Sequence, residues 1–457
     1  MISTPKGTRD FGPAQMAKRQ FIFDTLRQQF RLFGFQHIET PAMENLSVLT
    51  GKYGEEGDRL IFKILNSGDY LAGVPEGQVA NGATKLTPFI SEKALRYDLT
   101  VPFARYVANN RGTLTFPFRR FQMQPVWRAD RPQRGRYREF WQCDADIVGT
   151  DSLVAEAELL LLLQSTFYAL GYESFKIKIN SRKILMALAE YLGAENQFQN
   201  FCTGIDKLDK IGVEGVSKEL KERGIPAASV DKLAPFLAMQ GNGFSLLEQW
   251  RGMLAGTPSG PAGMAELQTI AENAQMQGLP MGILDFDPTL ARGLDYYTGC
   301  IIEVKPEGVV MGSIAGGGRY DNLAGVFGAS GISGVGVSFG VDRIYDVLEE
   351  LNLFPTLSPS SAKVLIAPLD VEAMPMAFAL LAKLRNASIA AEVYPEPAKL
   401  KKQLNYADKL AIPFVAIFGK DEVARAQFAM KDMVTGAQEN MNAEELIAKL
   451  QISNQNT

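Results

Sequence analysis

Hydrophobic and polar residues alternate along residues 118–149, and we expect the rest of the protein to be built around this stretch. Phe121 and Met123 alternate with glutamines, as in a half-buried strand. The alternation returns over residues 139–149 and predicts a second strand with two unlike faces. The apolar face holds Trp141, Cys143, Ala145 and Ile147, and the other holds Phe140, Gln142, Asp144 and Asp146. The pattern predicts an antiparallel hairpin that packs on the protein body through its apolar face.

The loop between these two strands is rich in arginine. Its five arginines are Arg128, Arg131, Arg134, Arg136 and Arg138. Asp130 is the only carboxylate among them, and guanidinium groups pair well with phosphate oxygens. We interpret the loop as a polyphosphate-facing surface. A solvated basic loop on an edge hairpin is the alternative, and the two-faced second strand makes it less favoured.

The N-terminal segment has simpler patterns. Apolar residues at helical spacing over 15–33 predict a helix, and residues 35–40 predict a strand that ends at Pro41. Residues 55–64 predict a further strand with flanking charges. The only histidine, His37, lies in the strand over 35–40, where we expect a structural role.

Asp98 and Thr100 lie two residues apart before a predicted helix over 103–109. At the end of a strand they would share one face, where an acid and a hydroxyl can hold an ammonium group. Capping of the helix is the alternative.

The middle of the chain changes character. A helix is predicted over 151–170 and a strand over 175–180. Residues 182–260 then become helical, rich in Lys and Glu and short of strands, which predicts an inserted helical domain. Arg292 and Tyr297 follow in the segment RGLDYY, before a strand over 301–304.

Two glycine-containing segments follow. Gly316, Gly317 and Gly318 allow positive φ or close approach to a ligand, although such a run is more often only a turn. A strand over 335–339 leads into a helix with Arg343 in its first turn. A cation there opposes the helix dipole, so we expect an anion such as phosphate nearby.

A Pro- and Ser-rich linker over 353–362 precedes a compact α/β unit over 363–457. Strands are predicted over 363–368, 390–395, 413–419 and 426–432, and helices over 374–384, 398–410 and 443–450.

Composition excludes several classes of protein. The chain has 457 residues, 46% hydrophobic and 21% charged, which is typical of a soluble globular protein of two to four domains. Its net charge of −4 neither indicates nor excludes nucleic-acid binding. No run reaches membrane-spanning length, and no signal peptide is evident. Three distant cysteines predict a reducing, cytoplasmic location, and a single histidine argues against a multi-histidine metal site.

The hairpin WRADRPQRGRYREF resembles motif 2 of the class II aminoacyl-tRNA synthetases, which carries ATP and the amino acid in that family. The helix and strand before Pro41 resemble motif 1, the dimer interface, and GVGVSFGVDR resembles motif 3. RGLDYYTG followed by GGGRYDNL, with PKGTRDFGP at the N-terminus, is similar to the histidyl-tRNA synthetases. The resemblance covers nearly the whole chain, including an anticodon-binding domain at the C-terminus.

The resemblance implies an α+β fold: a class II antiparallel-sheet catalytic domain over 1–181 and 261–352, a helical insertion over 182–260, a linker over 353–362 and an α/β anticodon-binding domain over 363–457. It implies a homodimer that ligates L-histidine to tRNA(His) through a histidyl-adenylate, with ATP as the second substrate, used together with Mg²⁺. No protein metal site is expected.

The resemblance also assigns residues. Histidine would be bound by Asp98, Thr100, Gln142, Asp146, Tyr297 and Tyr320. ATP would be bound by Arg128, Arg136, Phe140 and Arg343, with Arg292 and Arg128 as the catalytic cations. Gln133 would meet the acceptor end of the tRNA. Asp98 and Asp146 stand where many bacterial members have Glu, so the charge is kept while each side chain is one methylene shorter.

One competing function belongs to another class. A non-catalytic paralogue in this family serves as the regulatory subunit of ATP phosphoribosyltransferase. It usually lacks the C-terminal domain and tends to lose the arginine of RGLDYY, and this chain keeps both. Synthetases for other amino acids are disfavoured by RGLDYY. A plain tRNA-binding scaffold would not need Arg128, Arg292 and Arg343 together.

Overall fold

The structure is a computed structural model that describes residues 2–52, 54–233, 236, 239, 243–291, 297–425 and 427–455. The chain forms two compact units. The first consists of Met1–Asp10 and Phe21–Phe354, and the second of Phe11–Gln20 and Pro355–Thr457. Within the described residues, no helix has the length and apolar character needed to cross a bilayer.

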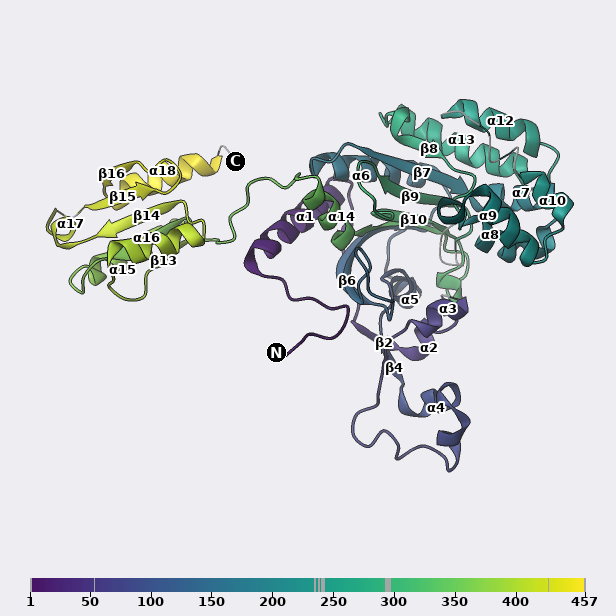
Figure 1. The fold of residues 1–457 in the computed structure, drawn as a ribbon, viewed down its shortest axis with the longest axis horizontal. Coiled ribbons are helices and arrows are strands. Elements are labelled where there is room, and N and C mark those ends of the chain that lie inside the picture. The colour runs from purple at the N-terminus through teal and green to yellow at the C-terminus, as the bar shows by residue number, and fades with distance from the viewer. Residues whose placement is uncertain are drawn as a thin grey trace. The chain divides into compact units, whose positions relative to one another are not determined.

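An eight-stranded sheet forms the centre of the first unit (Figure 1). In order across the sheet its strands are β1 (Gln36–His37), β5 (Phe118–Trp127), β6 (Glu139–Val148), β11 (Gly334–Gly340), β10 (Ala315–Tyr320), β9 (Cys300–Pro306), β7 (Phe175–Ser181) and β8 (Leu284–Phe286). The pairs β1–β5 and β7–β8 are parallel, and the other neighbours are antiparallel. A mainly antiparallel sheet covered by helices confirms the predicted α+β class.

Strands β5 and β6 form the predicted hairpin. Their register pairs Phe121 with Ala145 and continues along ten residues of each strand. Cys143, Ala145 and Ile147 are buried in the main hydrophobic cluster, which confirms the apolar face of β6.

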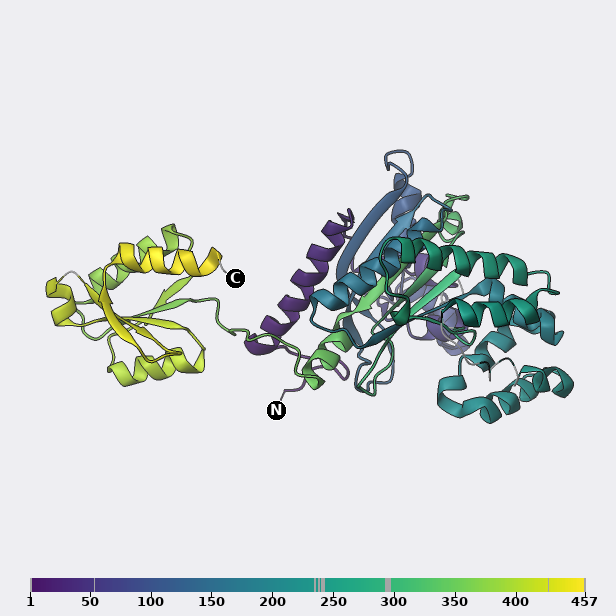
Figure 2. The same cartoon turned by 90° about the horizontal axis from the view of Figure 1, so that it is seen from above.

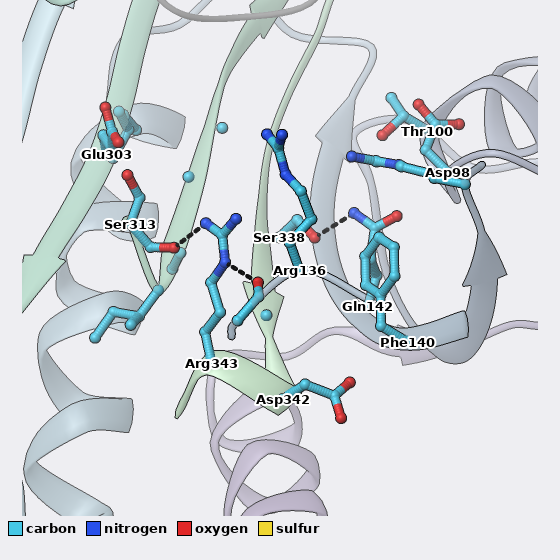
Figure 3. Close-up of a pocket in the computed structure, with 18 of the residues that line it drawn as sticks. Asp98, Thr100, Arg136, Phe140, Gln142, Glu303, Ser313, Ser338, Asp342 and Arg343 are labelled. Carbon is cyan, nitrogen blue, oxygen red and sulfur yellow. Dashed lines mark hydrogen bonds between the residues drawn. The ribbon is translucent and has the colours of Figure 1, made fainter. Parts of the chain in front are cut away.

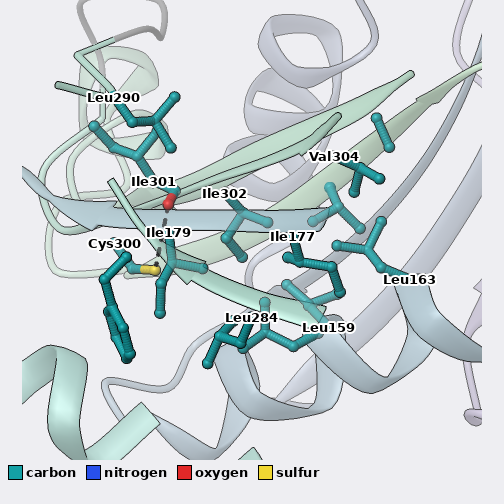
Figure 4. Packing of buried hydrophobic residues seen from close by; sticks show 14 of the residues in the cluster. Leu159, Leu163, Ile177, Ile179, Leu284, Leu290, Cys300, Ile301, Ile302 and Val304 are labelled. Carbon is teal, nitrogen blue, oxygen red and sulfur yellow. Dashed lines mark hydrogen bonds between the residues drawn. The ribbon is translucent and has the colours of Figure 1, made fainter. Parts of the chain in front are cut away.

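Helices α1 (Pro13–Leu32) and α6 (Val154–Ala169) supply much of the apolar cover of this sheet. Ile22, Leu26 and Phe30 recur every four residues along α1 and are fully buried, and the ring of Phe30 lies 5.2 Å from that of Phe121. Figure 4 shows Leu159 and Leu163 of α6 beside the apolar side chains of β7 and β9. Each such side chain contributes about 1.5–3 kcal/mol through burial, so the sheet is held rigidly from this side.

Between β7 and β8 the described chain is helical, as predicted. The helices are α7 (Arg182–Leu192), α8 (Phe198–Ile205), α9 (Leu208–Glu222), α10 (Ala227–Asp231), α12 (Phe244–Leu254) and α13 (Gly260–Met276), with a short 3-10 turn, η2 (Glu195–Gln197). Buried residues of this region, such as Phe201 and Trp250, belong to the same hydrophobic cluster as the sheet. α13 begins where the predicted insertion ends, at Gly260, and packs on α6 and α7. The borders of the insertion therefore stay a prediction.

A small sheet orders β2 (Met43–Asn45), β4 (Lys93–Leu95) and β3 (Lys63–Ile64). The short helices of this region are α2 (Leu46–Leu49), α3 (Gly54–Arg59), η1 (Gln78–Asn81), α4 (Ala83–Ile90) and α5 (Thr100–Asn110). The strand predicted over 55–64 is therefore wrong except at Lys63–Ile64. The charged residues before it disfavour a strand and form α3 instead.

The glycine run lies inside strand β10 and forms neither a turn nor a positive-φ segment. A Cβ atom on Gly317 would lie 1.9 Å from the carbonyl oxygen of Gly336, and one on Gly318 would lie 2.5 Å from that of Cys300. The run therefore permits close contact between strands of the sheet.

The second unit contains a five-stranded sheet ordered β13 (Ala391–Val393), β12 (Val364–Pro368), β14 (Phe414–Phe418), β15 (Phe428–Asp432) and β16 (Gln438–Met441). Val364 and Ile366 share one apolar cluster with α15 (Met374–Asn386) and α18 (Ala443–Gln455), whereas Leu365 shares another with α16 (Leu400–Lys409). Figure 2 shows this helix–sheet–helix layering. The predicted strands and helices are confirmed, and the sequence patterns missed β16 and α17 (Lys420–Arg425).

Candidate active site

A cavity of about 380 Å³ opens in the first unit between the hairpin loop, strands β6, β9, β10 and β11, and helix α14 (Val341–Glu350) (Figure 3). The structure brings eight predicted site residues to its wall: Asp98, Thr100, Arg128, Arg136, Phe140, Gln142, Tyr297 and Arg343. These residues come from segments more than two hundred positions apart in the chain. Convergence of polar groups and rings in one concave site is typical of a ligand pocket.

Arg343 stands in the first turn of α14, as predicted. Its Nε donates to the carbonyl oxygen of Gly135 at 2.7 Å, and its Nη1 donates to that of Ser313 at 2.7 Å (Figure 3). The Arg343 charge lies at the positive end of the α14 dipole, and the two carbonyl oxygens offset this repulsion. They also fix the guanidinium at the cavity wall. Asp342, next to it, forms an ion pair with Arg9 and accepts from the Trp141 backbone N–H at 3.1 Å.

Arg128 is held by backbone and aromatic contacts. Its Nε donates to the carbonyl oxygen of Tyr97 at 3.0 Å. Its guanidinium carbon lies 4.2 Å from the centre of the Tyr97 ring and 5.2 Å from that of Phe140. Burial raises the pKa of Tyr97, with the Arg128 charge acting in the opposite direction. A guanidinium oriented in this way presents its remaining N–H groups with little rotational freedom.

Two arginines of the hairpin loop have different surroundings. Arg136 is half exposed, lies 3.9 Å from Asp130 and extends into the cavity (Figure 3). Arg134 forms an exposed ion pair with Glu350 of α14, so the expectation that Asp130 alone could pair with these arginines is wrong. Gln133 is exposed in the same loop, where its backbone exchanges hydrogen bonds with Arg136.

Asp98 and Thr100 lie at the start of α5 and not on a strand, because β4 ends at Leu95. The Asp98 Oδ1 accepts from the backbone N–H of Val101 at 3.1 Å. The helix-capping alternative is thus correct for one oxygen of Asp98, while its side chain also lines the cavity. An anchored carboxylate with a hydroxyl beside it can hold an ammonium group.

Asp146 and Tyr320 do not reach the cavity wall and lie beneath its floor. The Tyr320 hydroxyl donates to Asp146 Oδ1 at 2.5 Å, and Arg120 Nη2 lies 2.8 Å from Asp146 Oδ2. A Cβ atom on Gly336 would stand 2.0 Å from Asp146 Oδ1, so only glycine leaves room for this carboxylate. Burial raises the pKa of Asp146 while the Arg120 charge lowers it, and burial raises the pKa of Tyr320 well above its usual value.

A second carboxyl, Asp144, shares this buried layer. Its pKa is raised to about 7 in total: burial raises it most, the Arg120 charge lowers it, and the Asp146 charge raises it. One guanidinium therefore stands beside two carboxyls that compete for it.

Arg120, Ser338 and Glu303 were missed by the sequence interpretation. Arg120 is fully buried with its guanidinium 4.1 Å from the centre of the Phe103 ring. Its position two residues before Gln122 placed it on the polar face of β5, so the alternation contained this signal. Glu303 and Ser338 line the cavity from β9 and β11, and nothing in their local sequence distinguishes them.

Arg292, the predicted catalytic cation, lies outside the described residues. The flanking Leu290 and Tyr297 both line the cavity. The described part of the chain contains no cluster of three or more His, Cys, Asp or Glu arranged to hold a metal.

Comparisons with known proteins match both units. A family model described as histidyl-tRNA synthetase matches residues 7–344, and one described as anticodon binding domain matches residues 363–452. The histidine–tRNA ligase of Cytophaga hutchinsonii is 53% identical over 98% of this chain and 99% of its own length. That of Christiangramia forsetii is 51% identical over 96% and 97%. The crystal structure of the histidyl-tRNA synthetase from Nostoc sp. PCC 7120 aligns with a TM-score of 0.84 at 32% identity, covering 99% of both chains.

Proposed function

The chain belongs to the histidyl-tRNA synthetase family, and from this premise we propose the roles of its residues in the reaction. The protein is a class II histidine–tRNA ligase that uses ATP to attach L-histidine to tRNA(His). The observation that carries the residue assignment is the convergence of three guanidiniums and the Asp98–Thr100 pair in one cavity.

The first step joins histidine to ATP. A carboxylate oxygen of histidine attacks the α-phosphorus, a new P–O bond forms, and pyrophosphate leaves. Arg128 contacts the α-phosphate, Arg136 a phosphate nearby and Arg343 the γ-phosphate, while adenine stacks on Phe140. Fixed cations stabilise the charge that develops at the α-phosphate without reorganising. Arg292 is assigned the same task at the α-phosphate and at the substrate carboxylate.

The amino acid lies beside these cations. Asp98, Thr100 and Gln142 hold its α-ammonium, an assignment supported by their common place at the cavity wall. Tyr297 and Asp146 bind the imidazole, and Tyr320 fixes the Asp146 carboxylate from below. Because Asp146 lies under the floor, its role requires that the side chain of histidine reach between Tyr297 and β6. A matched donor and acceptor pair there would favour histidine over amino acids whose side chains cannot donate a hydrogen bond to the Asp146 carboxylate.

The second step transfers histidine to the tRNA. A ribose hydroxyl of the terminal adenosine attacks the carbonyl carbon, the ester forms, and AMP leaves. Gln133 is assigned to the acceptor end, which its exposed place in the hairpin loop supports. Neither step needs a protein nucleophile. The three cysteines are buried, and His37 stacks on Phe121 with ring centres 4.7 Å apart.

Mg²⁺ is proposed to enter with ATP. The cavity wall offers the carboxylates of Asp130 and Glu303, which suit a hard cation, but the described residues include no complete set of protein ligands. Phosphate oxygens and water would supply the remaining ligands, and the ion would neutralise charge on the triphosphate.

We further propose a homodimer and a cytoplasmic location. The first rests on the similarity of residues 15–41 to motif 1 and on the self-complementary interface of a twofold dimer. The second rests on three buried free cysteines, which suit a reducing compartment.

The decisive experiment is ATP–pyrophosphate exchange with each of the twenty amino acids. Exchange that depends on histidine alone is the expected result, and exchange with another amino acid would overturn the histidine assignment. A chain that gives no exchange with any amino acid would favour the regulatory alternative, to which the comparisons lend less support.

A further inference from the structure

The N-terminal segment over residues 5–10 lies against the hairpin loop of the cavity. The backbone N–H of Arg138 donates to the carbonyl oxygen of Gly7 at 2.9 Å. Gly7 has a φ of +86°, and a Cβ atom there would lie 2.8 Å from Cγ of Arg138 and 2.9 Å from Cγ of Pro132. A side chain at this position would therefore strain the backbone and displace the loop.

Two residues further along, Arg9 joins the loop to helix α14. Its guanidinium carbon lies 3.3 Å from the centre of the Tyr137 ring. Its Nη2 forms an ion pair with Asp342 Oδ1. The side chain of Arg9 thus contacts the sequence neighbours of two proposed phosphate-binding residues, Arg136 in the loop and Arg343 in the helix.

Asp342 gives this contact an electrostatic role. Its carboxylate lines the cavity proposed to hold the triphosphate, and only 5% of its side-chain surface is exposed. A buried carboxylate without a cation would repel the phosphates of ATP, because water screens it poorly. Arg9 supplies a cation at one carboxylate oxygen, and the Trp141 backbone N–H donates to the other at 3.1 Å.

We propose that Arg9 is a positioning residue for the triphosphate, which neutralises Asp342 at the cavity wall and holds the hairpin loop against α14. Arg136 and Arg343 are in this way kept facing one ligand. This inference rests on the proposed function, in which those two arginines bind phosphates of ATP. Arg9 itself does not line the cavity, so it acts on the ligand through Asp342 and Tyr137.

Arg9→Gln removes the cation and keeps a polar side chain. In histidine-dependent ATP–pyrophosphate exchange by the full-length protein, the KM values for ATP and for pyrophosphate should both rise roughly tenfold, the scale of one uncompensated charge at a partly buried site. The KM for histidine should change less than about twofold. Adenosine, which lacks phosphates, should inhibit the variant and the unaltered protein equally. All are measured at pH 8, which favours ionised carboxylates.

The double variant Arg9→Gln with Asp342→Asn gives the sharper test. It removes both charges and leaves two amides, which can hydrogen-bond to each other and still accept from the Trp141 N–H. The KM values for ATP and pyrophosphate should therefore return to within about threefold of those of the unaltered protein. Asp342→Asn alone completes the cycle, and the losses add if the two residues act independently.

Arg119→Gln is the matched control. Arg119 is about as exposed as Arg9, forms an ion pair with Glu158 at 2.5 Å and lies outside the cavity wall. Its loss should leave the KM values for ATP and pyrophosphate unchanged. Arg9→Lys keeps the charge but not the planar contact with Tyr137, and it should raise both values by about threefold.

Equal weakening of ATP, pyrophosphate and adenosine, additive losses in the cycle, or a similar effect of Arg119→Gln would overturn the proposal. If Arg9→Gln does not fold, as judged by circular dichroism, Arg9→Lys must still weaken ATP and pyrophosphate selectively for the proposal to stand. The proposed function fails separately: it fails if the unaltered protein does not activate histidine. If it activates histidine and Arg9→Gln leaves the KM values for ATP and pyrophosphate unchanged, only the positioning role is wrong.

Discussion

Asp146→Asn tests the imidazole assignment with the least change in shape. The substitution removes a carboxylate that can accept from an imidazole N–H and leaves a neutral amide of the same size. A hydrogen bond to a charged group contributes about 1.5–3 kcal/mol, so the KM for histidine should rise by roughly ten- to hundredfold. The KM for ATP should change little, because the phosphate-binding arginines lie elsewhere on the cavity wall.

The same substitution disturbs a buried ion pair, and the structure predicts how that disturbance depends on pH. Removing one partner of a buried pair costs about 3–5 kcal/mol, and Arg120 has no solvent exposure. Asp144 can take over as counter-ion once it is ionised. The pKa of Asp144 in the folded protein is raised to about 7. The free energy of unfolding therefore falls as the pH rises from about 4 to about 7, because Asp144 ionises less readily in the folded than in the unfolded protein. In the variant, position 146 carries no charge and no longer raises the pKa of Asp144. Ionisation of Asp144 therefore costs less folding stability in the variant than in the unaltered protein.

We therefore expect Asp146→Asn to be destabilised most near pH 5 and least near pH 8. Thermal unfolding of both proteins across this range measures the stability, and steady-state exchange at pH 8 measures the two KM values. Equal increases in the KM for histidine and for ATP would refute the imidazole assignment. If the difference in thermal unfolding midpoint between the two proteins does not vary with pH, the reasoning that Asp144 and Asp146 share the Arg120 guanidinium is wrong. Asp146→Ala is the poorer test, because it also leaves a void beside Tyr320 and Gly336.

Three further predictions concern other parts of the chain. Deleting residues 363–457 should leave histidine-dependent pyrophosphate exchange largely intact but weaken tRNA charging, and equal loss of both in a folded protein would contradict the domain assignment. Sedimentation should give a dimer at micromolar concentration, and a fully active monomer would exclude the proposed interface. Arg292→Ala should slow adenylate formation by roughly two to three orders of magnitude, the scale of one preorganised donor, with little recovery by Lys. Single-turnover measurements should show transfer from preformed adenylate less affected, and near-normal adenylation would return Arg292 to a structural role.

Local patterns in the sequence predicted the elements that depend on a single periodicity. The two-faced strand β6 and the helix α14 with Arg343 in its first turn were correct because one side of each is buried. The strand over 55–64 failed because a short charged run has no strong period, and its conformation as α3 depends on packing elsewhere. The interpretation of the glycine run as a turn was wrong for a related reason, since the run permits close approach to strands distant in the sequence.

Within the site, the sequence predicted the side chains that line the cavity better than the residues that hold those side chains in place. The sequence identified Arg128, Gln142 and Arg343 because each stands in a recognisable motif. It did not identify Ser338, which accepts from the Gln142 side chain because β11 pairs with β6 in the sheet. The ion pair between Arg134 and Glu350 joins residues 216 positions apart, and no spacing rule connects them. Such partners are determined by the three-dimensional register.

This sheet contains two clusters of buried charge, one around Arg319 and one around Arg120. Their contacts suggest that the first serves the structure and the second serves the function. Away from the cavity wall, Arg319 has one buried carboxylate partner, Glu156, with 2.8 Å between Nη2 and Oε2. Its second carboxylate neighbour, Asp321 at 3.8 Å, is partly exposed, and Arg319 also donates to Thr150 and Ser333. Beneath the cavity, Arg120 instead faces two carboxyls, and the pKa of one of them is raised to about 7. A buried pair with its hydrogen bonds satisfied is close to neutral for stability, whereas an unbalanced cluster is costly. Stability alone would favour an apolar replacement there, so the excess carboxylate is best explained by the ligand that binds above it.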